Sequence, residues 1–216
     1  MNVTAMRVFV TLFAAFFILS IHVQAQKKKT PKKDQVVTIS TSFGDMVLIL
    51  YDQTPKHKEN FLKLVDEKFY DGTAFHRVIK EFMIQGGDPL SKEGEDSDKA
   101  GTGGPGYTVP AEFVDGILHT KGALAAARQG DQMNPEKASS GSQFYIVHNP
   151  DRCRHLNGEY TVYGQVIQGL EVVDKIASQP VVRGSKPKED IRMTMTSQKM
   201  KRKKVTEIYG YEYPES

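Results

Sequence analysis

A charged side chain and an amide side chain stand within an otherwise apolar stretch of the sequence. Residues 75–88 read FHRVIKEFMIQGGD. The apolar members favour two short β-strands, in which Arg77 and Gln85 are the polar exceptions. Burying a guanidinium without partners is costly, so we expect Arg77 either to be paired within the protein or to face a cleft. Gly86 and Gly87 then permit a backbone path that residues with a Cβ would resist.

The chain as a whole is long enough for one domain with a sizeable core. It has 216 residues, of which 39% are hydrophobic and 25% charged, as is ordinary for a globular protein. A net charge of +3 is too small to indicate nucleic-acid binding, so no such partner is expected. None of the six histidines stands at metal-ligand spacing, so we expect neither a metal nor another cofactor.

Residues 1–25 have the features of a signal peptide. Arg7 precedes an apolar run over 8–23, and small residues at Val23 and Ala25 predict cleavage after Ala25. The run is shorter than the roughly 20 residues of a spanning helix, although an uncleaved membrane anchor formed by 8–23 is the alternative. We therefore expect a periplasmic or secreted protein with no integral membrane span after cleavage. Residues 26–34, QKKKTPKKD, are predicted to be a basic, disordered linker.

The rest of the chain is predicted to be rich in β-strands. Thr54 as N-cap and Pro55 at the first helical position predict a helix toward Phe69, and apolar spacing predicts a second over 169–177. Strands are expected at 36–42, 46–51, 142–148, 160–166 and 190–195, in addition to the pair in 75–85. Residues 122–128 have helical propensity, but their context favours a strand. Many strands with two helices indicate an all-β barrel or sandwich capped by helices.

Several short motifs, in their order along the chain, resemble those of the cyclophilins, which are peptidyl-prolyl cis-trans isomerases. Besides 75–88 they are GTGG (101–104), GALAAA (122–127), GSQFYI (141–146), LNG (156–158) and YGQV (163–166). Several ordered motifs are more specific than any single one. The resemblance covers about residues 35–197, the predicted isomerase domain. It implies a mainly β fold: a closed eight-stranded antiparallel barrel with a helix over each open end.

The reaction that this resemblance implies breaks no covalent bond. Rotation about a prolyl amide is slow because the partial double bond imposes a barrier of about 18–20 kcal/mol. In the twisted transition state the amide nitrogen regains its lone pair, so a catalyst should offer it a hydrogen-bond donor and hold the proline ring in an apolar pocket. By resemblance Arg77 is the catalytic donor, a role that suits its rigid, permanently charged fork of N–H groups.

The resemblance also implies which residues hold the substrate. By resemblance the proline pocket is formed by Phe82, Met83, Tyr145 and Leu156. Tyr160 lies at its rim and His76 beside it. The residues that grip the peptide are Gln85, Gln143 and the backbone around Ala127 and Arg128. Composition alone would instead make Phe82, Met83 and Leu156 ordinary core residues, and Arg77 a paired structural arginine.

Four positions deserve separate interpretation. His155 stands where many cyclophilins carry the Trp that helps bind cyclosporin, which puts tight drug binding in doubt but not isomerase activity. Arg128 replaces an Asn whose contact is mainly through the backbone, and Tyr145 replaces a common Phe and adds a hydroxyl to the pocket wall. Cys153 is the only cysteine, flanked by basic residues that would favour its thiolate, against the alternative of an inconsequential surface thiol.

Residues 198–216 are predicted to be a basic and aromatic tail outside the domain, solvated except for a partly docked end. The alternatives are a tail that binds a partner or an acidic surface, and a tail that folds back on the barrel. The function expected from all these features is a monomeric isomerase that acts on proline-containing polypeptides and assists the folding of exported proteins. The alternative is a non-catalytic module that binds proline-containing segments as a chaperone or scaffold.

Overall fold

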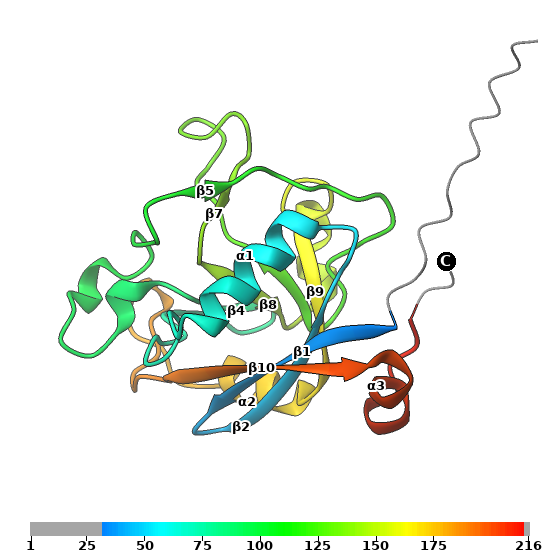
Figure 1. Cartoon of the computed structure of the whole chain (residues 1–216). Helices are drawn as coiled ribbons and strands as arrows, with labels where there is room; N and C mark the ends of the chain where they lie inside the picture. Colours follow the sequence, from blue (N-terminus) through cyan, green and yellow to red (C-terminus); the bar gives the residue numbers. More distant parts are fainter. Residues whose placement is uncertain (1–31, 214–216) are drawn as a thin grey trace, which may run out of the picture. The chain divides into compact units, whose positions relative to one another are not determined.

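The described part of the protein is built round one antiparallel sheet. The computed structural model describes residues 32–213, so the expected signal peptide and most of the basic linker lie outside the described residues. The sheet has eight strands (Figure 1). In spatial order they are β10 (Met193–Lys201), β1 (Lys33–Thr41), β2 (Gly44–Leu50), β9 (Val162–Gln168), β6 (Ala123–Ala126), β8 (Phe144–Val147), β4 (Met83–Gly86) and β3 (Arg77–Ile79). The short strands β5 (Thr108–Val109) and β7 (Ser139–Ser140) pair separately.

Three α-helices accompany this sheet in the described residues, where two were expected. They are α1 (Pro55–Asp66), α2 (Leu170–Ala177) and α3 (Arg202–Tyr209). Single turns of 3-10 helix lie at η2 (Pro89–Ser91), η3 (Ser97–Lys99), η4 (Pro150–Arg152), η5 (Arg154–Leu156) and η6 (Arg183–Ser185). The helices α1 and α2 bury apolar side chains, among them Phe61 and Ile176, in the main core with the inner faces of the strands. Within residues 32–213, no helix combines the length and the apolar character needed to cross a membrane.

The start of α1 is capped differently from the sequence-based expectation. Thr54 is the N-cap residue and Pro55 follows it, but the Thr54 hydroxyl donates to Tyr51 O at 3.3 Å and caps nothing. The carboxylate of Glu112 accepts hydrogen bonds from the backbone N–H groups of Lys56 (3.1 Å) and His57 (3.0 Å) instead. An acidic group at a helix N-terminus satisfies free N–H groups and the helix dipole together. The cap therefore comes from 55 residues further along the chain, where local reasoning cannot find it.

The expected closure of the sheet into a barrel is not confirmed by a strand ladder. Strands β10 and β3 are the two ends of the hydrogen-bonded order. Contact between these ends is made by the irregular segments before them, through an isolated bridge between Ala74 and Arg192. Backbone hydrogen bonds from Phe75 N to Ile191 O (2.9 Å) and from Met193 N to Thr73 O (2.8 Å) flank this bridge. The mainly β, antiparallel architecture is as expected, with the two ends of the sheet joined over a few residues.

Tertiary pairing decides the conformation of the alanine-rich segment. Residues 123–126 form β6, between β8 and β9, as the context of the sequence predicted. All four residues are buried, so burial on both faces outweighs the helical preference of Ala and Leu. Small side chains suit this central position because neighbouring side chains fill both sides of the sheet.

The chain beyond residue 197 is docked more extensively than expected, since only its end was predicted to be docked. Strand β10 continues to Lys201, which pairs with Lys33 of β1, so the first strand begins inside the expected linker. Helix α3 follows at the end of β10, beside the start of β1 (Figure 1). Val205 of this helix is completely buried. The described C-terminal residues are therefore docked on the sheet.

Candidate active site

The expected site residues come together at one pocket of about 460 Å³. Of the residues proposed from the sequence, those that line it are His76, Arg77, Phe82, Met83, Gln85, Ala127, Arg128, Tyr145, Leu156 and Tyr160. Gln143 lies outside this pocket but lines an adjoining hollow of about 910 Å³. Both hollows have Gln85, Gly101, Ala127 and Arg128 in their walls, so they form one continuous depression.

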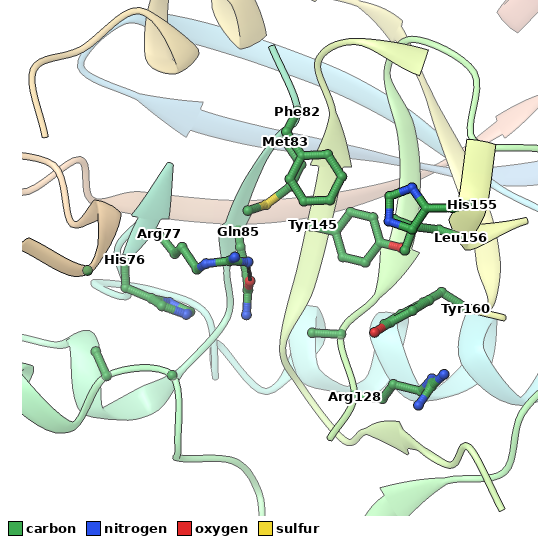
Figure 2. A pocket seen from close by; sticks show the side chains of 14 residues that line it. His76, Arg77, Phe82, Met83, Gln85, Arg128, Tyr145, His155, Leu156 and Tyr160 are labelled. Carbon is green, nitrogen blue, oxygen red and sulfur yellow. Dashed lines mark hydrogen bonds between the residues drawn. The ribbon is translucent and has the colours of Figure 1, made fainter. Parts of the chain in front are cut away.

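One side of the pocket is apolar because it is the exposed margin of a buried cluster. Met83, Tyr145 and Leu156 belong to this cluster, and Phe82 and Tyr160 pack against it. The Phe82 ring stacks on His155, with 6.2 Å between centroids and 14° between the ring planes (Figure 2). His155 thus contributes to the rim in the place where a Trp is common in the family resembled. The surface offered to a ligand is a shallow set of aromatic and aliphatic walls.

Arg77 stands on the polar side of the same pocket. It lies on β3 directly opposite Gln85 of β4, and its Nη1 donates to Gln85 Oε1 at 3.2 Å. Figure 2 shows the two side chains converging across from the apolar residues. Within residues 32–213 no carboxylate lies within ion-pair distance of Arg77. Of the two possibilities that the sequence left open, the structure shows the arginine that faces a cleft.

A chain of hydrogen bonds holds the polar side in place. Gln85 Nε2 donates to Gln143 Oε1 (3.1 Å), and Gln143 Nε2 donates to Asp88 Oδ2 (3.1 Å). Asp88 is fully buried, and the same oxygen accepts from the backbone N–H groups of Gly101 (2.6 Å) and Gly103 (2.8 Å). A buried carboxylate needs such donors, since an unpaired charge is costly to desolvate. The carboxylate therefore fixes the orientation of both glutamine amides, and through Gln85 that of Arg77.

Asp88 was not predicted to be a site residue, although it ends the motif of residues 75–88. The sequence did contain a signal for this role: an acidic residue directly after two glycines, followed by a loop rich in glycine and other turn-forming residues. Such a loop offers free N–H groups that a carboxylate can gather. Ala100, Gly101 and Gly184 also line the pocket and were not proposed, because small residues carry no chemical signal in a single sequence.

The side chain of Arg128 is turned into the wall and not toward the pocket centre. It is only 4% exposed, and its Nε donates to the backbone oxygen of Glu159 (2.9 Å) while Nη1 donates to Asp131 (2.6 Å). Its guanidinium carbon lies 4.4 Å from the centroid of the Tyr160 ring, a cation–π contact that supports the rim. The N–H of Ala127 is bonded to Gln143 O, so a bound peptide cannot use it without breaking that bond.

Burial favours the neutral form of two titratable side chains near the pocket, His76 and Cys153. Burial lowers the pKa of His76, although the charge of Asp88 acts in the opposite direction. Burial raises the pKa of the Cys153 thiol to about 11. Cys153 is completely buried with its sulfur 3.6 Å from Phe82 O, so the structure corrects both readings of this residue, as a thiolate and as a surface thiol. Arg77 remains the charged group that faces the pocket.

Comparison with known proteins agrees with this geometry. The family model described as "Cyclophilin type peptidyl-prolyl cis-trans isomerase/CLD" matches residues 36–198. The isomerase CYP18-1 of Arabidopsis thaliana is 40% identical over 73% of this chain and 91% of its own length. Peptidyl-prolyl cis-trans isomerase B of Bacillus subtilis is 43% identical over 61% of this chain and 82% of its own length.

A solved structure gives the same result. The crystal structure of a cyclophilin-type isomerase of Cryptosporidium parvum superposes with a TM-score of 0.67 at 32% identity, covering 76% of this chain and 98% of that one. The mainly antiparallel fold of this chain is thus that of a cyclophilin-type isomerase. The chain belongs to the cyclophilin-type peptidyl-prolyl cis-trans isomerase family.

Proposed function

We propose that the pocket receives the proline ring of a polypeptide and that Arg77 donates to the twisted amide nitrogen. The observation that carries this proposal is an arginine that has no ion-pair partner among residues 32–213 and is held by Gln85 beside an apolar pocket. The positive charge is thus available to a ligand, and its orientation is set before the ligand binds. Preorganised donors aimed at the transition state are the commonest source of large rate enhancements.

The proposed substrate is a proline-containing segment that lies along the depression. Its proline ring would lie against the pocket walls formed by Phe82, Met83 and Leu156, while Gln85 and Gln143 contact the backbone of the substrate on either side. A second crystal structure of the Cryptosporidium parvum protein was obtained in the presence of the dipeptide Ala-Pro. That protein matches this chain at 31% identity with a TM-score of 0.65, which supports the same class of ligand here. The monomeric state expected from the sequence stays a prediction.

Isomerase activity on a short Xaa-Pro peptide tests this function. We expect the protein to catalyse cis–trans exchange. In a protease-coupled assay this should accelerate the kinetic phase that is limited by isomerisation of the peptide, and in NMR spectra it should produce exchange cross-peaks. A protein that binds the peptide but leaves its exchange rate unchanged would be the non-catalytic chaperone or scaffold, and the catalytic proposal would be wrong.

The site of action is a separate proposal, which the sequence of the N-terminal residues supports. We propose that residues 1–25 direct export and are removed, so that the isomerase assists protein folding in a periplasmic or extracellular compartment. Mass spectrometry of the protein from its native host should then show a mature N-terminus near Gln26. Full-length protein in the membrane fraction would indicate the anchor formed by 8–23 instead.

A further inference from the structure

The hydroxyl group of Tyr145 has no part in the mechanism described above, yet it is buried and hydrogen-bonded. Tyr145 is 4% exposed, and its ring lines the pocket. Figure 2 shows the hydroxyl on the side of the ring toward Leu156, away from Arg77 and Gln85. There it lies 2.8 Å from Nε2 of His119, which is behind the pocket wall. The ring therefore faces the ligand while its polar end is held by a residue that does not line the pocket.

The hydrogen bonds around His119 determine which ring nitrogen carries the proton. The backbone N–H of His119 donates to Oδ1 of Asn157 at 2.9 Å, so an oxygen of the amide faces His119. Nδ1 lies 2.8 Å from this oxygen, which can only accept, so Nδ1 carries the proton. In the neutral ring Nε2 is then the acceptor, and the Tyr145 hydroxyl donates to it. Burial lowers the pKa of His119 and raises the pKa of Tyr145, which keeps both groups in these neutral forms.

The hydrogen bonds from Asn157 through His119 to Tyr145 connect two parts of the pocket wall that are distant in sequence. Asn157 directly follows Leu156, which lines the pocket, and Tyr145 belongs to β8. His119 is 3% exposed, and its ring lies nearly parallel to that of Tyr145, with 5.9 Å between centroids and 8° between planes. A swing of the whole Tyr145 side chain away from His119 would leave a buried hydroxyl and a buried imidazole nitrogen without partners, which is costly.

We propose that His119 and Asn157 are positioning residues, which fix the Tyr145 ring as a wall of the proline pocket through an Asn157–His119–Tyr145 hydrogen-bond chain. The inference rests on the proposed function, since the pocket must receive the proline ring. A wall that cannot swing keeps the ring of the substrate where the twisted amide meets Arg77. Small displacements of positioned groups reduce a rate even when all reacting groups are present.

The first test determines the protonation of His119 within the hydrogen-bond chain, without any activity measurement. Histidine side-chain ¹H–¹⁵N correlation spectra of the full-length protein should show His119 as the tautomer protonated at Nδ1, with Nε2 unprotonated. Asn157→Leu removes the acceptor for Nδ1–H and should abolish this preference. An Nε2-protonated His119 in the wild-type protein would overturn the assignment of the chain and the proposal with it.

The second test separates positioning from simple packing. We expect His119→Leu to lower kcat/KM on a short Xaa-Pro peptide by about fivefold, the size of one neutral hydrogen bond. Tyr145→Phe removes only the hydroxyl and should have a similar effect. Because both substitutions break the same chain, the double variant should be no slower than either single one. If His119 merely fills space, the losses will multiply.

Matched variants complete the design. Asn157→Asp keeps an acceptor oxygen for His119 and should retain most of the rate that Asn157→Leu loses; this pair also carries the comparison if His119→Leu does not fold. Thr120→Val removes a neighbouring hydroxyl that donates to Gln165 Oε1 at 3.1 Å, outside the pocket, and should leave the rate unchanged. If the wild-type protein shows no activity, the proposed function fails and this proposal with it. An active wild type with unaffected His119 and Asn157 variants overturns the positioning role alone.

Discussion

Arg77→Ala should lower kcat/KM on a short Xaa-Pro peptide by about a hundredfold, since the loss of one preorganised donor to a transition state typically costs 10²–10³ in rate. The twisted amide nitrogen would lose its donor, while the proline pocket would keep its walls. The fold should persist because the only side-chain hydrogen bond of Arg77 in the described residues goes to Gln85. Circular dichroism and melting temperature, measured beside turnover, show whether the variant is folded.

Two further substitutions distinguish geometry from charge. Arg77→Lys keeps the positive charge but lacks the planar fork, so it should recover little of the lost activity. Lys80→Ala removes an exposed cation just beyond the same strand and should leave turnover unchanged. A folded Arg77→Ala protein with nearly wild-type turnover would show that the donor is elsewhere, and an equal loss in Lys80→Ala would attribute the effect to the general charge of this surface.

The positions of the strands could be predicted because their apolar residues are local signals. Residues 36–42 and 46–51 alternate or run apolar between turn residues, and both became strands that pair with each other. The capping of α1 could not be predicted, because Glu112 reaches it only in the folded chain. The contact between the two ends of the sheet joins irregular backbone at 72–75 to the first residues of the strand expected at 190–195, and no local pattern indicates that these two segments meet.

The resemblance named most of the residues that line the pocket, but not the residues that hold them in place. Resemblance identified Arg77 and the pocket walls, and the structure brings them together. Asp88 and His119 were missed because their importance comes from burial and from partners distant in sequence. Residues of these types are also common in ordinary turns. The supporting residues of a site can therefore be identified only once the hydrogen bonds are known.

The sequence of the second strand contained a signal for the docking of the C-terminus. The run MVLIL at 46–50 is apolar at every position, which predicts a strand buried on both faces. Its inner face packs in the main core, and its outer residues Val47 and Ile49 need a cover. The cover comes from Val205 of α3 and from Tyr209, Tyr211 and Tyr213, which pack against the same cluster.

Charge reinforces this docking. Arg202 forms ion pairs with Asp34 and Asp52, and its guanidinium carbon lies 4.3 Å from the centroid of the Tyr213 ring. Asp34 has only 3% of its side chain exposed, and Lys58 also contacts it at 2.6 Å. Removing Arg202 would leave the buried Asp34 with Lys58 as its remaining ion-pair partner among the described residues, and weakening a buried charge cluster in this way is costly.

Deleting residues 202–216 should therefore destabilise the protein without affecting its chemistry. We expect the free energy of unfolding to fall by about 4 kcal/mol, since several largely apolar side chains lose their cover and the ordering entropy regained offsets only part of this. For a domain of this size that corresponds to a melting temperature lower by roughly 10 °C. Turnover per folded molecule should stay close to wild type, because no residue after Gly184 lines the pocket in the described part of the chain.

Two adjacent substitutions test the same contact in the full-length protein. Arg202→Ala removes the ion pairs and the contact with Tyr213, and should cost about 2 kcal/mol of stability, below the 3–5 kcal/mol of a fully buried pair because Arg202 is partly exposed. Lys203→Ala is the matched control, because Lys203 is 88% exposed and its one ion pair within the described residues is with Glu207 of the same helix, so its effect should be close to zero. Equal melting temperatures for the two variants would show that the contacts of Arg202 do not stabilise the domain, and an unchanged melting temperature in the deletion variant would show this of the whole docked C-terminus. Lost turnover in a folded deletion variant would mean instead that the segment helps to form the active site.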